Sequence, residues 1–214
     1  MGLRRAPYGS VGLTCIGFAL LAASCHDVRL GEVKSGEEVV VIGGGHIGLL
    51  IALVAASTKA RVLVSEVNSF RLNLARQLGL EAVNPKEVDL ADLVGKRTGG
   101  AGADVVFEVS GSAAGAATMT QLVRTRGRIV VVAIFGEAPK VDIVRFFWRE
   151  LRLRGARVYE PEDFDKAIAL SASGALPLEH LISARRPLKD LQAVFEQIEA
   201  STDLMKVLMD TRGE

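Results

Sequence analysis

The stretch Val39-Val40-Val41-Ile42-Gly43-Gly44-Gly45-His46-Ile47-Gly48 predicts a strand, a tight turn and a helix in immediate succession. Its four consecutive aliphatic residues indicate a strand that is covered on both faces, as in a parallel sheet. Residues 46–57, after the glycines, are apolar almost all round and therefore indicate a buried helix. Because a strand that enters a helix in this way begins a crossover, we expect the next strand to lie parallel to the first.

The same alternation of short aliphatic runs and helical stretches continues along the 214-residue chain. It predicts an α/β fold with a doubly wound, parallel, six-stranded sheet of the Rossmann type. The predicted strands are residues 39–42, 61–65, 82–83, 104–107, 128–132 and 151–155. The predicted helices between them are residues 46–57, 70–78, 87–96 and 113–123. The basic stretch at 145–157 is mixed with aromatic and aliphatic residues, so we expect it to surround a buried strand.

Three regions follow from this pattern. Residues 1–34 form an N-terminal segment with a linker helix, and residues 35–160 form the Rossmann domain. Residues 161–214 differ, because helices at 161–173 and 188–200 bracket Leu181-Ile182 before a last strand at 206–209. We expect this third region to return into a second, incomplete layer.

The N-terminal segment allows two interpretations. Arg4 and Arg5 precede an apolar run at 11–23, and small residues end the run just before Cys25, which is the layout of a secretory signal with a lipidated cysteine. The other interpretation is a buried helix that leads into the domain. The run is too short for a membrane span, which needs roughly 20 apolar residues. We take the helix and a cytoplasmic location as the working prediction, with export as the alternative if residues 1–25 are a signal.

The charge balance and the cysteine content exclude several classes of protein. The chain has 26 basic and 25 acidic residues, so it lacks the basic excess by which proteins displace counterions from nucleic acid. Its two cysteines, Cys15 and Cys25, form neither a disulfide framework nor a metal-binding C-x-x-C pair. A reducing compartment is therefore expected.

The glycine turn carries the chemistry. Gly43 permits the tight turn, Gly45 removes a side chain where a pyrophosphate approaches, and Gly48 lets the helix pack close to the sheet. The N-terminus of the helix then presents N–H groups to the phosphates. We expect the backbone N–H of His46 to matter more than its ring.

Glu66, at the end of the second predicted strand, is the expected acceptor of hydrogen bonds from the adenosine ribose. Its carboxylate would repel a 2′-phosphate and so favours NAD over NADP. The alternative is a solvated charge at a strand end. Arg71 either braces the ribose or lies on an exposed helix face. His26 and His180 have no partner at ligand spacing, so each is expected to be a surface or packing residue.

Four motifs together resemble the medium-chain, zinc-dependent alcohol and polyol dehydrogenases, in the branch that contains sorbitol, butanediol and threonine dehydrogenases. The motifs are residues 41–48, Ser65-Glu66, residues 102–111 (Gly-Ala-Asp-Val-Val-Phe-Glu-Val-Ser-Gly) and Arg157-Val158-Tyr159. The similarity extends from about Cys25 to Asp210, and Lys206-Val207-Leu208 suits the closing strand of the family.

The resemblance implies NAD bound at the carboxyl ends of the strands. The residues that it places there are Gly43, Gly45, His46, Ile47 and Gly48 at the pyrophosphate, Glu66 and Arg71 at the ribose, Val109, Ile134 and Phe135 along the nicotinamide, and Lys206 toward a phosphate. It also places residues 157–159 at the mouth that faces the substrate. Because the sixth strand often pairs across a two-fold axis in this family, Leu151 and Leu153 are expected at a homodimer edge.

The departures from the family concern catalysis. The N-terminal, GroES-like catalytic domain, which supplies a cysteine, a histidine and an acidic residue to zinc, is largely missing. Ala19 and Leu20 stand where the family has Glu-Pro, and Ala133 replaces a glycine beside the nicotinamide. We therefore predict no catalytic residue and no metal ligand in this chain, and we do not expect catalysis from it alone, because the alkoxide would lack its Lewis acid.

Three functions remain open from the sequence. The chain is the NAD-binding half of an oxidoreductase that moves hydride between NAD and a secondary alcohol once a zinc-bearing half completes it, or it is a non-catalytic NAD(H)-binding module or sensor. A methyltransferase on a related sheet is the third. If the catalytic half is absent, the apolar side chains of the last helix are expected to be exposed; they are Leu191, Val194, Phe195 and Ile198.

Overall fold

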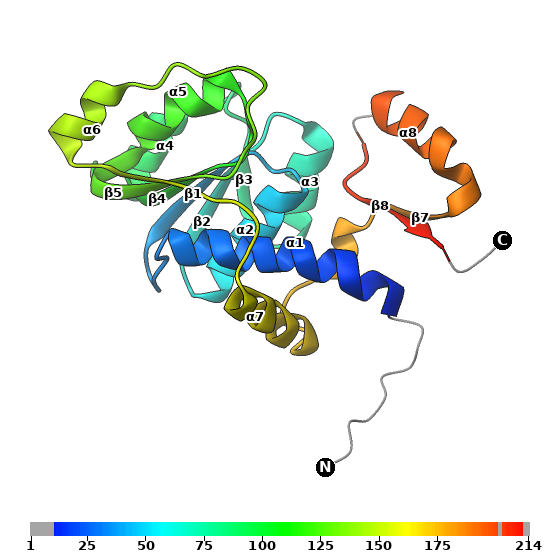
Figure 1. Ribbon diagram of the computed structural model, residues 1–214. Coiled ribbons are helices and arrows are strands. Elements are labelled where there is room, and N and C mark those ends of the chain that lie inside the picture. The colour runs from blue at the N-terminus through cyan, green and yellow to red at the C-terminus, as the bar shows by residue number, and fades with distance from the viewer. Residues whose placement is uncertain (1–10, 201–202, 212–214) are drawn as a thin grey trace, which may run out of the picture.

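Six parallel strands form the central sheet, in the order β3-β2-β1-β4-β5-β6 (Figure 1). The computed structural model describes residues 11–200 and 203–211, with side chains from residue 18 onward. The strands are β1 (Glu38–Ile42), β2 (Arg61–Ser65), β3 (Glu81–Val83), β4 (Ala103–Glu108), β5 (Val123–Val131) and β6 (Arg152–Gly155). The predicted Rossmann-type fold is confirmed, and its strand order reverses at β1, where β2 lies on one side and β4 on the other.

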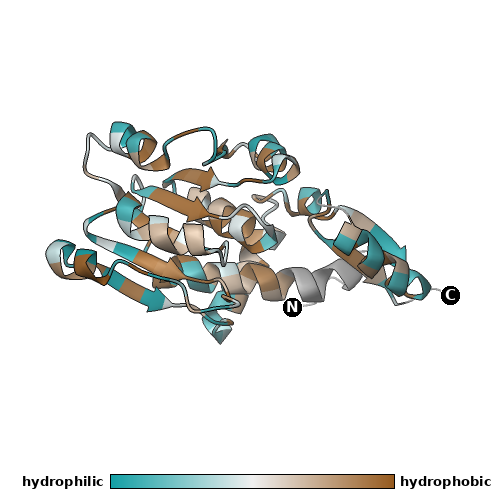
Figure 2. Cartoon of the chain, turned by 90° about the horizontal axis from the view of Figure 1, so that it is seen from above, coloured by the Kyte–Doolittle hydropathy of each residue, from teal (hydrophilic) through white to brown (hydrophobic). Residues whose placement is uncertain are grey.

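Helices cover both faces of this sheet. They are α2 (His46–Ser57), α3 (Ser69–Gln77), α4 (Leu90–Arg97), α5 (Ala113–Leu122) and α6 (Ile143–Arg149), preceded by α1 (Val11–Leu30) and followed by α7 (Pro161–Ala172). Alternate residues of β1 enter two separate cores: Val39 and Val41 pack with α1 and α2, whereas Val40 packs with α4 and α5. The brown central strands of Figure 2 show this apolar interior.

The helix interpretation of the N-terminal segment is confirmed for residues 11–30. Leu21, Ala22, Cys25 and Val28 are buried, at spacings that place them on one side of α1, against α2 and α7. Arg4 and Arg5 lie outside the described residues. Within the part of the chain that the structure describes, no helix has the length and apolar character needed to cross a membrane.

A second, small sheet follows the Rossmann unit. This sheet consists of two parallel strands, β7 (Ala184–Pro187) and β8 (Val207–Asp210). The helical elements of the same region are η2 (Leu178–Leu181), η3 (Leu188–Asp190) and α8 (Leu191–Ala200). Figure 1 shows α8, β7 and β8 beside the main body rather than over its sheet. The predicted helix at 188–200 thus opens with a separate 3₁₀ turn, and Leu181-Ile182 lies at the end of η2.

Around the sixth strand, one prediction is wrong and one helix was not predicted. The strand within 145–157 was expected to be buried, but all four residues of β6 are exposed, because β6 is the edge of the sheet. The apolar residues before it form α6, a helix that the alternation did not predict. Asp142 begins this helix by accepting hydrogen bonds from the backbone N–H groups of Val144 and Arg145.

Two predicted boundaries also move for local reasons. The fourth helix begins at Leu90 rather than near residue 87, because the Asp89 side chain accepts from the N–H groups of Ala91 and Asp92 and so caps it. Strand β5 begins at Val123, several residues earlier than predicted, with Arg126 in the left-handed conformation.

Candidate cofactor-binding site

The glycine turn lies at the carboxyl end of β1, where the strand order reverses. Gly43 has φ +103°, and a Cβ on it would lie 2.9 Å from the backbone nitrogen of Ser110, so the turn packs against the chain that leaves β4. A Cβ on Gly48 would overlap the carbonyl oxygen of Gly43 and lie 3.0 Å from its carbon. The first turn of α2 therefore packs directly on the glycine turn, and no side chain caps that helix at its N-cap, Gly45. Uncapped N–H groups of this kind attract an anion.

Glu66 follows β2 and closes one side of the turn. It is only 6% exposed, and its Oε2 accepts a 2.7 Å hydrogen bond from the N–H of Gly44, while Oε1 accepts from the N–H of Asn68 at 2.8 Å. A Cβ on Gly44 would lie 3.0 Å from the Cβ of Glu66, so a larger residue at 44 would crowd the carboxylate. Glu66 is thus a buried group at the turn, and the alternative of a solvated strand-end charge is wrong.

Arg71, near the start of α3, lies along the same turn. Its backbone N–H donates to Oδ1 of Asn68 at 3.0 Å, which fixes the start of the helix. Its side chain is half-buried, one terminal nitrogen lies 3.9 Å from the place of a Cβ on Gly45, and its Nε is buried without a hydrogen-bond partner. The exposed-face alternative for Arg71 is therefore wrong.

His46 is the first residue of α2, and its imidazole is half-buried. The ring nitrogen Nδ1 is buried and has no hydrogen-bond partner. Burial, and then the ammonium of Lys206, lower the pKa of His46 to about 4. Lys206 precedes β8, so the structure brings this late part of the chain near the glycine turn. Ile47, the next residue of α2, packs against the main core.

The far side of the site is built by the residues that follow β4 and β5. The N–H of Val109 donates to the carbonyl oxygen of Ile42 at 2.9 Å, which ties this segment to β1. A Cβ on Gly111 would lie 2.9 Å from the carbonyl oxygen of Ile134, which joins the segment to the chain after β5. The ends of β1, β4 and β5 thus meet, while the side chain of Ile134 is itself 96% exposed.

A buried carboxylate that the sequence interpretation passed over organises this segment. Glu108 is fully buried and accepts hydrogen bonds from the hydroxyl of Ser110 and from the N–H groups of Ser110 and Gly111, at 3.0 and 3.3 Å for the N–H donors. Glu108 lies within the motif at residues 102–111, but no role was predicted for its side chain. An acidic residue that ends a buried strand and precedes serine and glycine is the signal that points to this loop.

An open hollow of about 470 Å³ lies beside this segment, within the size range of ligand pockets. Its lining residues are Gly111, Ala113, Ala117, Phe135, Glu137, Ala138, Pro139 and Lys140. Phe135, which the family resemblance places along the nicotinamide, is one of these lining residues. Residues 157–159, predicted at the substrate mouth, lie exposed after β6.

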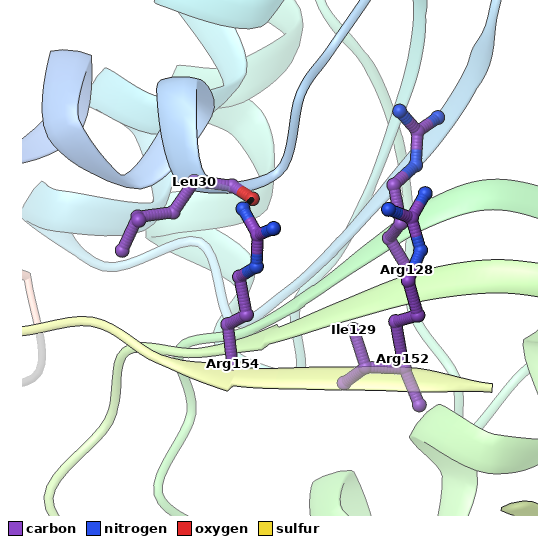
Figure 3. Close-up of a pocket in the computed structure, with 5 residues that line it drawn as sticks. All are labelled: Leu30, Arg128, Ile129, Arg152 and Arg154. Atoms are coloured by element: carbon purple, nitrogen blue, oxygen red, sulfur yellow. Dashed lines mark hydrogen bonds between the residues drawn. The ribbon is translucent and has the colours of Figure 1, made fainter.

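A second, much smaller cavity lies at the opposite, amino-terminal edge of the sheet (Figure 3). Its volume of about 10 Å³ suits at most a single water molecule. Its arginines are already bound to the chain: Arg128 donates to the carbonyl oxygen of Glu32 at 2.7 Å, and Arg154 donates to that of Leu30 at 3.0 Å. This cavity is a structural feature of the sheet edge.

The described residues contain one group of potential metal ligands, His26, Glu160 and Asp163, between α1 and the start of α7. His26 is buried, and its Nδ1 lies 2.8 Å from Oδ2 of Asp163, so its predicted packing role is confirmed with a partner 137 residues away. Arg29 lies among the three, 2.6 Å from Glu160 and 2.9 Å from Asp163. Because a guanidinium already neutralises these carboxylates, the group does not fit a catalytic zinc.

Four apolar side chains of α8 were predicted to be exposed, and three of them are. Leu191, Phe195 and Ile198 are 40%, 55% and 49% exposed. Val194 is buried at 6%, so its predicted exposure is wrong. An apolar stripe nevertheless remains on α8.

Comparison with known proteins places this site in a family. A model described as "Zinc-binding dehydrogenase" matches residues 47–173. A 2-dehydro-3-deoxy-L-galactonate 5-dehydrogenase of Pseudoalteromonas atlantica is 50% identical over 194 residues, which are 91% of this chain and 57% of that protein. The structure of 2R,3R-butanediol dehydrogenase from Bacillus subtilis superposes with a TM-score of 0.85 at 25% identity, over 91% of this chain and 56% of that one. A Sinorhizobium meliloti structure, named as a zinc-binding dehydrogenase bound to NADP, gives a TM-score of 0.83 at 29% identity, over 91% and 58%.

Proposed function

The chain belongs to the zinc-binding dehydrogenase family and corresponds to the nucleotide-binding half of a medium-chain dehydrogenase, and on this premise we propose that it binds NAD(H) at the carboxyl ends of β1, β2 and β4. The chain spans little more than half the length of the relatives it matches. The activity of a whole dehydrogenase is therefore part of the proposal.

The observation that carries the proposal is the contact between Glu66 and the glycine turn. The uncapped start of α2 offers N–H groups to a pyrophosphate, and the buried carboxylate lies 2.7 Å from the N–H of Gly44, within the same turn. Each carboxylate oxygen has a second lone-pair site, so Glu66 can accept a ribose hydroxyl without releasing the backbone. The orphaned Nε of Arg71 adds a donor beside the same turn.

We propose NAD as the preferred cofactor, because a 2′-phosphate would bring negative charge against the Glu66 carboxylate. The NADP-bound relative makes this preference the first point to test. Titration with NADH and NADPH, followed by fluorescence, should give at least about tenfold tighter NADH binding, the equivalent of roughly 1.4 kcal/mol. Glu66→Gln should remove most of that preference, whereas the control Glu199→Ala, on the exposed part of α8, should keep it. Equal affinities in the parent chain would contradict the role of Glu66.

We propose that hydride transfer needs a zinc-bearing partner half. In the family, zinc supplies a Lewis acid for the alkoxide. In this chain, Glu66 and the turn would hold the cofactor, and Phe135 would line the nicotinamide side. A secondary hydroxyl of an acyclic sugar acid is the substrate class to test, by likeness to the Pseudoalteromonas atlantica relative. The purified chain should show no turnover alone and gain it when mixed with the N-terminal half of that relative.

The alternative function is a non-catalytic NAD(H)-binding module. The observation that favours it is that the proposed cofactor contacts, Glu66 against the glycine turn, lie wholly within this chain. Cofactor binding without turnover, even with the added zinc-bearing half, would support this alternative and contradict the oxidoreductase.

We further propose a homodimer through β6. Leu153, in the middle of this edge strand, is 49% exposed, and Phe147 and Trp148 of the preceding helix are 76% and 75% exposed. The side chain of Arg152 forms an ion pair with Glu32 and so does not cover the strand edge. The backbone groups of that edge can therefore pair with a second copy. Light scattering should show a dimer that Leu153→Asp converts to a monomer, and that Val88→Asp, at another exposed apolar site, leaves intact. A monomeric parent would contradict the dimer.

We infer a cytoplasmic location, because nicotinamide dinucleotides are cytoplasmic metabolites. Fractionation of expressing cells should recover the chain with cytoplasmic markers. Recovery from the periplasm, with residues 1–25 removed, would instead support export.

A further inference from the structure

We propose that His46 takes up a proton when the cofactor pyrophosphate binds at the start of α2, so that cofactor affinity rises as the pH falls. This inference rests on the proposed nucleotide site, to which it adds a titrating residue. It concerns the imidazole ring of His46, whereas the proposed phosphate contacts of the glycine turn use only backbone N–H groups.

The first argument is geometric. His46 opens α2 directly after Gly45, in the turn whose N–H groups would hold the phosphates. Its Nδ1 is buried and has no hydrogen-bond partner. A buried polar atom without a partner costs stability, so it needs an explanation. A phosphate oxygen can only accept hydrogen bonds. A protonated imidazole carries an N–H at both ring nitrogens, so it can donate from whichever nitrogen faces the phosphate.

The second argument is electrostatic. Burial and the Lys206 ammonium hold the pKa of His46 at about 4, so the ring is neutral in the free protein near neutral pH. The other charged groups at the turn are Glu66, against Gly44, and Arg71, beside Gly45. A pyrophosphate would add two negative charges next to the ring and offset the ammonium. Nearby anions favour the protonated form of an imidazole, so its pKa rises on binding.

The sign and the size of the effect follow from linkage. Because the bound state holds the proton more tightly than the free state, lower pH favours binding. If binding only restores the pKa to its ordinary value of about 6.5, affinity is about tenfold higher near pH 5.5 than near pH 7.5. About half a proton is then taken up for each ligand bound near pH 6.5.

The test is calorimetric titration with ADP-ribose, which carries the pyrophosphate but no reactive nicotinamide. Its diphosphate diester does not titrate across this range, so proton uptake reports on the protein. Titrations near pH 6.5 in PIPES and in imidazole, which have different heats of ionisation, give the number of protons taken up. We expect roughly half a proton for the parent chain and none for His46→Asn.

Two control variants keep this result specific. His180→Asn changes an exposed histidine on η2 and should keep the proton uptake. Asp27→Asn removes a second group that titrates near neutral pH, since burial raises the pKa of Asp27 to about 7, and it should also keep the uptake. NMR titration of the His46 ring, free and with ADP-ribose, provides a second measurement if His46→Asn fails to fold.

The outcomes separate the two proposals. Failure of the parent chain to bind ADP-ribose would contradict the nucleotide site itself. Binding without proton uptake, or uptake that persists in folded His46→Asn, would overturn only the role of His46.

Discussion

The packing of α2 against the glycine turn predicts that Gly48→Ala will be severe. The new Cβ would overlap the carbonyl oxygen of Gly43 and lie 3.0 Å from its carbon, both of which are backbone atoms that no rotamer change can move. To regain an ordinary contact of about 3.5 Å or more, the helix must withdraw by on the order of 1 Å. Every residue from Gly48 to Ala55 is buried, so this movement opens the core along the first two turns of α2.

Overpacking of a well-packed core costs about 1–3 kcal/mol and occasionally more. We expect Gly48→Ala to reach the upper end, about 3 kcal/mol, because the clash is with backbone. For a chain of this length, that loss lowers Tm by roughly 6–12 °C. ADP-ribose binding should also weaken strongly, since the displaced helix carries the N–H groups that would hold the phosphates.

The matched control is Gly95→Ala, at a position of α4 where the added Cβ has room. A Cβ on Gly95 would meet no atom within 4 Å, and alanine is the better helix former by about 1 kcal/mol. Urea unfolding should therefore move the two variants in opposite directions from the parent chain. If Gly48→Ala unfolds within about 0.5 kcal/mol of the parent and still binds ADP-ribose, the close approach of α2 to the turn is refuted.

Three further predictions concern groups away from the turn. Burial, and then Asp163, raise the pKa of Asp27 to about 7, above its unfolded value, so its contribution to stability is lost as pH rises toward 7. Asp27→Asn should therefore raise the free energy of unfolding near pH 8 by on the order of 2 kcal/mol and have little effect near pH 4, as urea titrations would show. Arg29 holds the pKa of Asp163 well below its ordinary value against the opposing effect of burial, so this group stabilises the fold above about pH 4 and the contribution is lost on acidification. Asp163→Asn should speed hydrogen exchange in α7 at neutral pH, and an unchanged exchange rate would contradict the ion pair. Val194→Ser should cost about 2 kcal/mol by thermal unfolding, whereas Phe195→Ser, on the exposed side of α8, should stay within about 0.5 kcal/mol.

The sequence by itself determined the strand–turn–helix unit at the centre of the fold. The helix at residues 46–57 and the second strand at residues 61–65 were predicted to the residue, because local periodicity, glycine and chain length fix them without distant contacts. The positions of the glycines and of Glu66 were equally readable, since a dinucleotide turn specifies them by spacing. The cofactor roles of these residues stay predictions.

Only the tertiary structure decided which side of an element is buried and which distant residues meet. The sequence could not show that β6 is exposed, because whether another strand or helix covers the Arg-Leu-Arg-Gly stretch depends on where β6 lies in the sheet, and β6 lies at the edge. Nor could spacing pair His26 with Asp163, or bring Lys206 near His46, because these partners lie far apart along the chain. Periodicity is a property of neighbouring residues, whereas burial and charge coupling depend on how the whole chain packs.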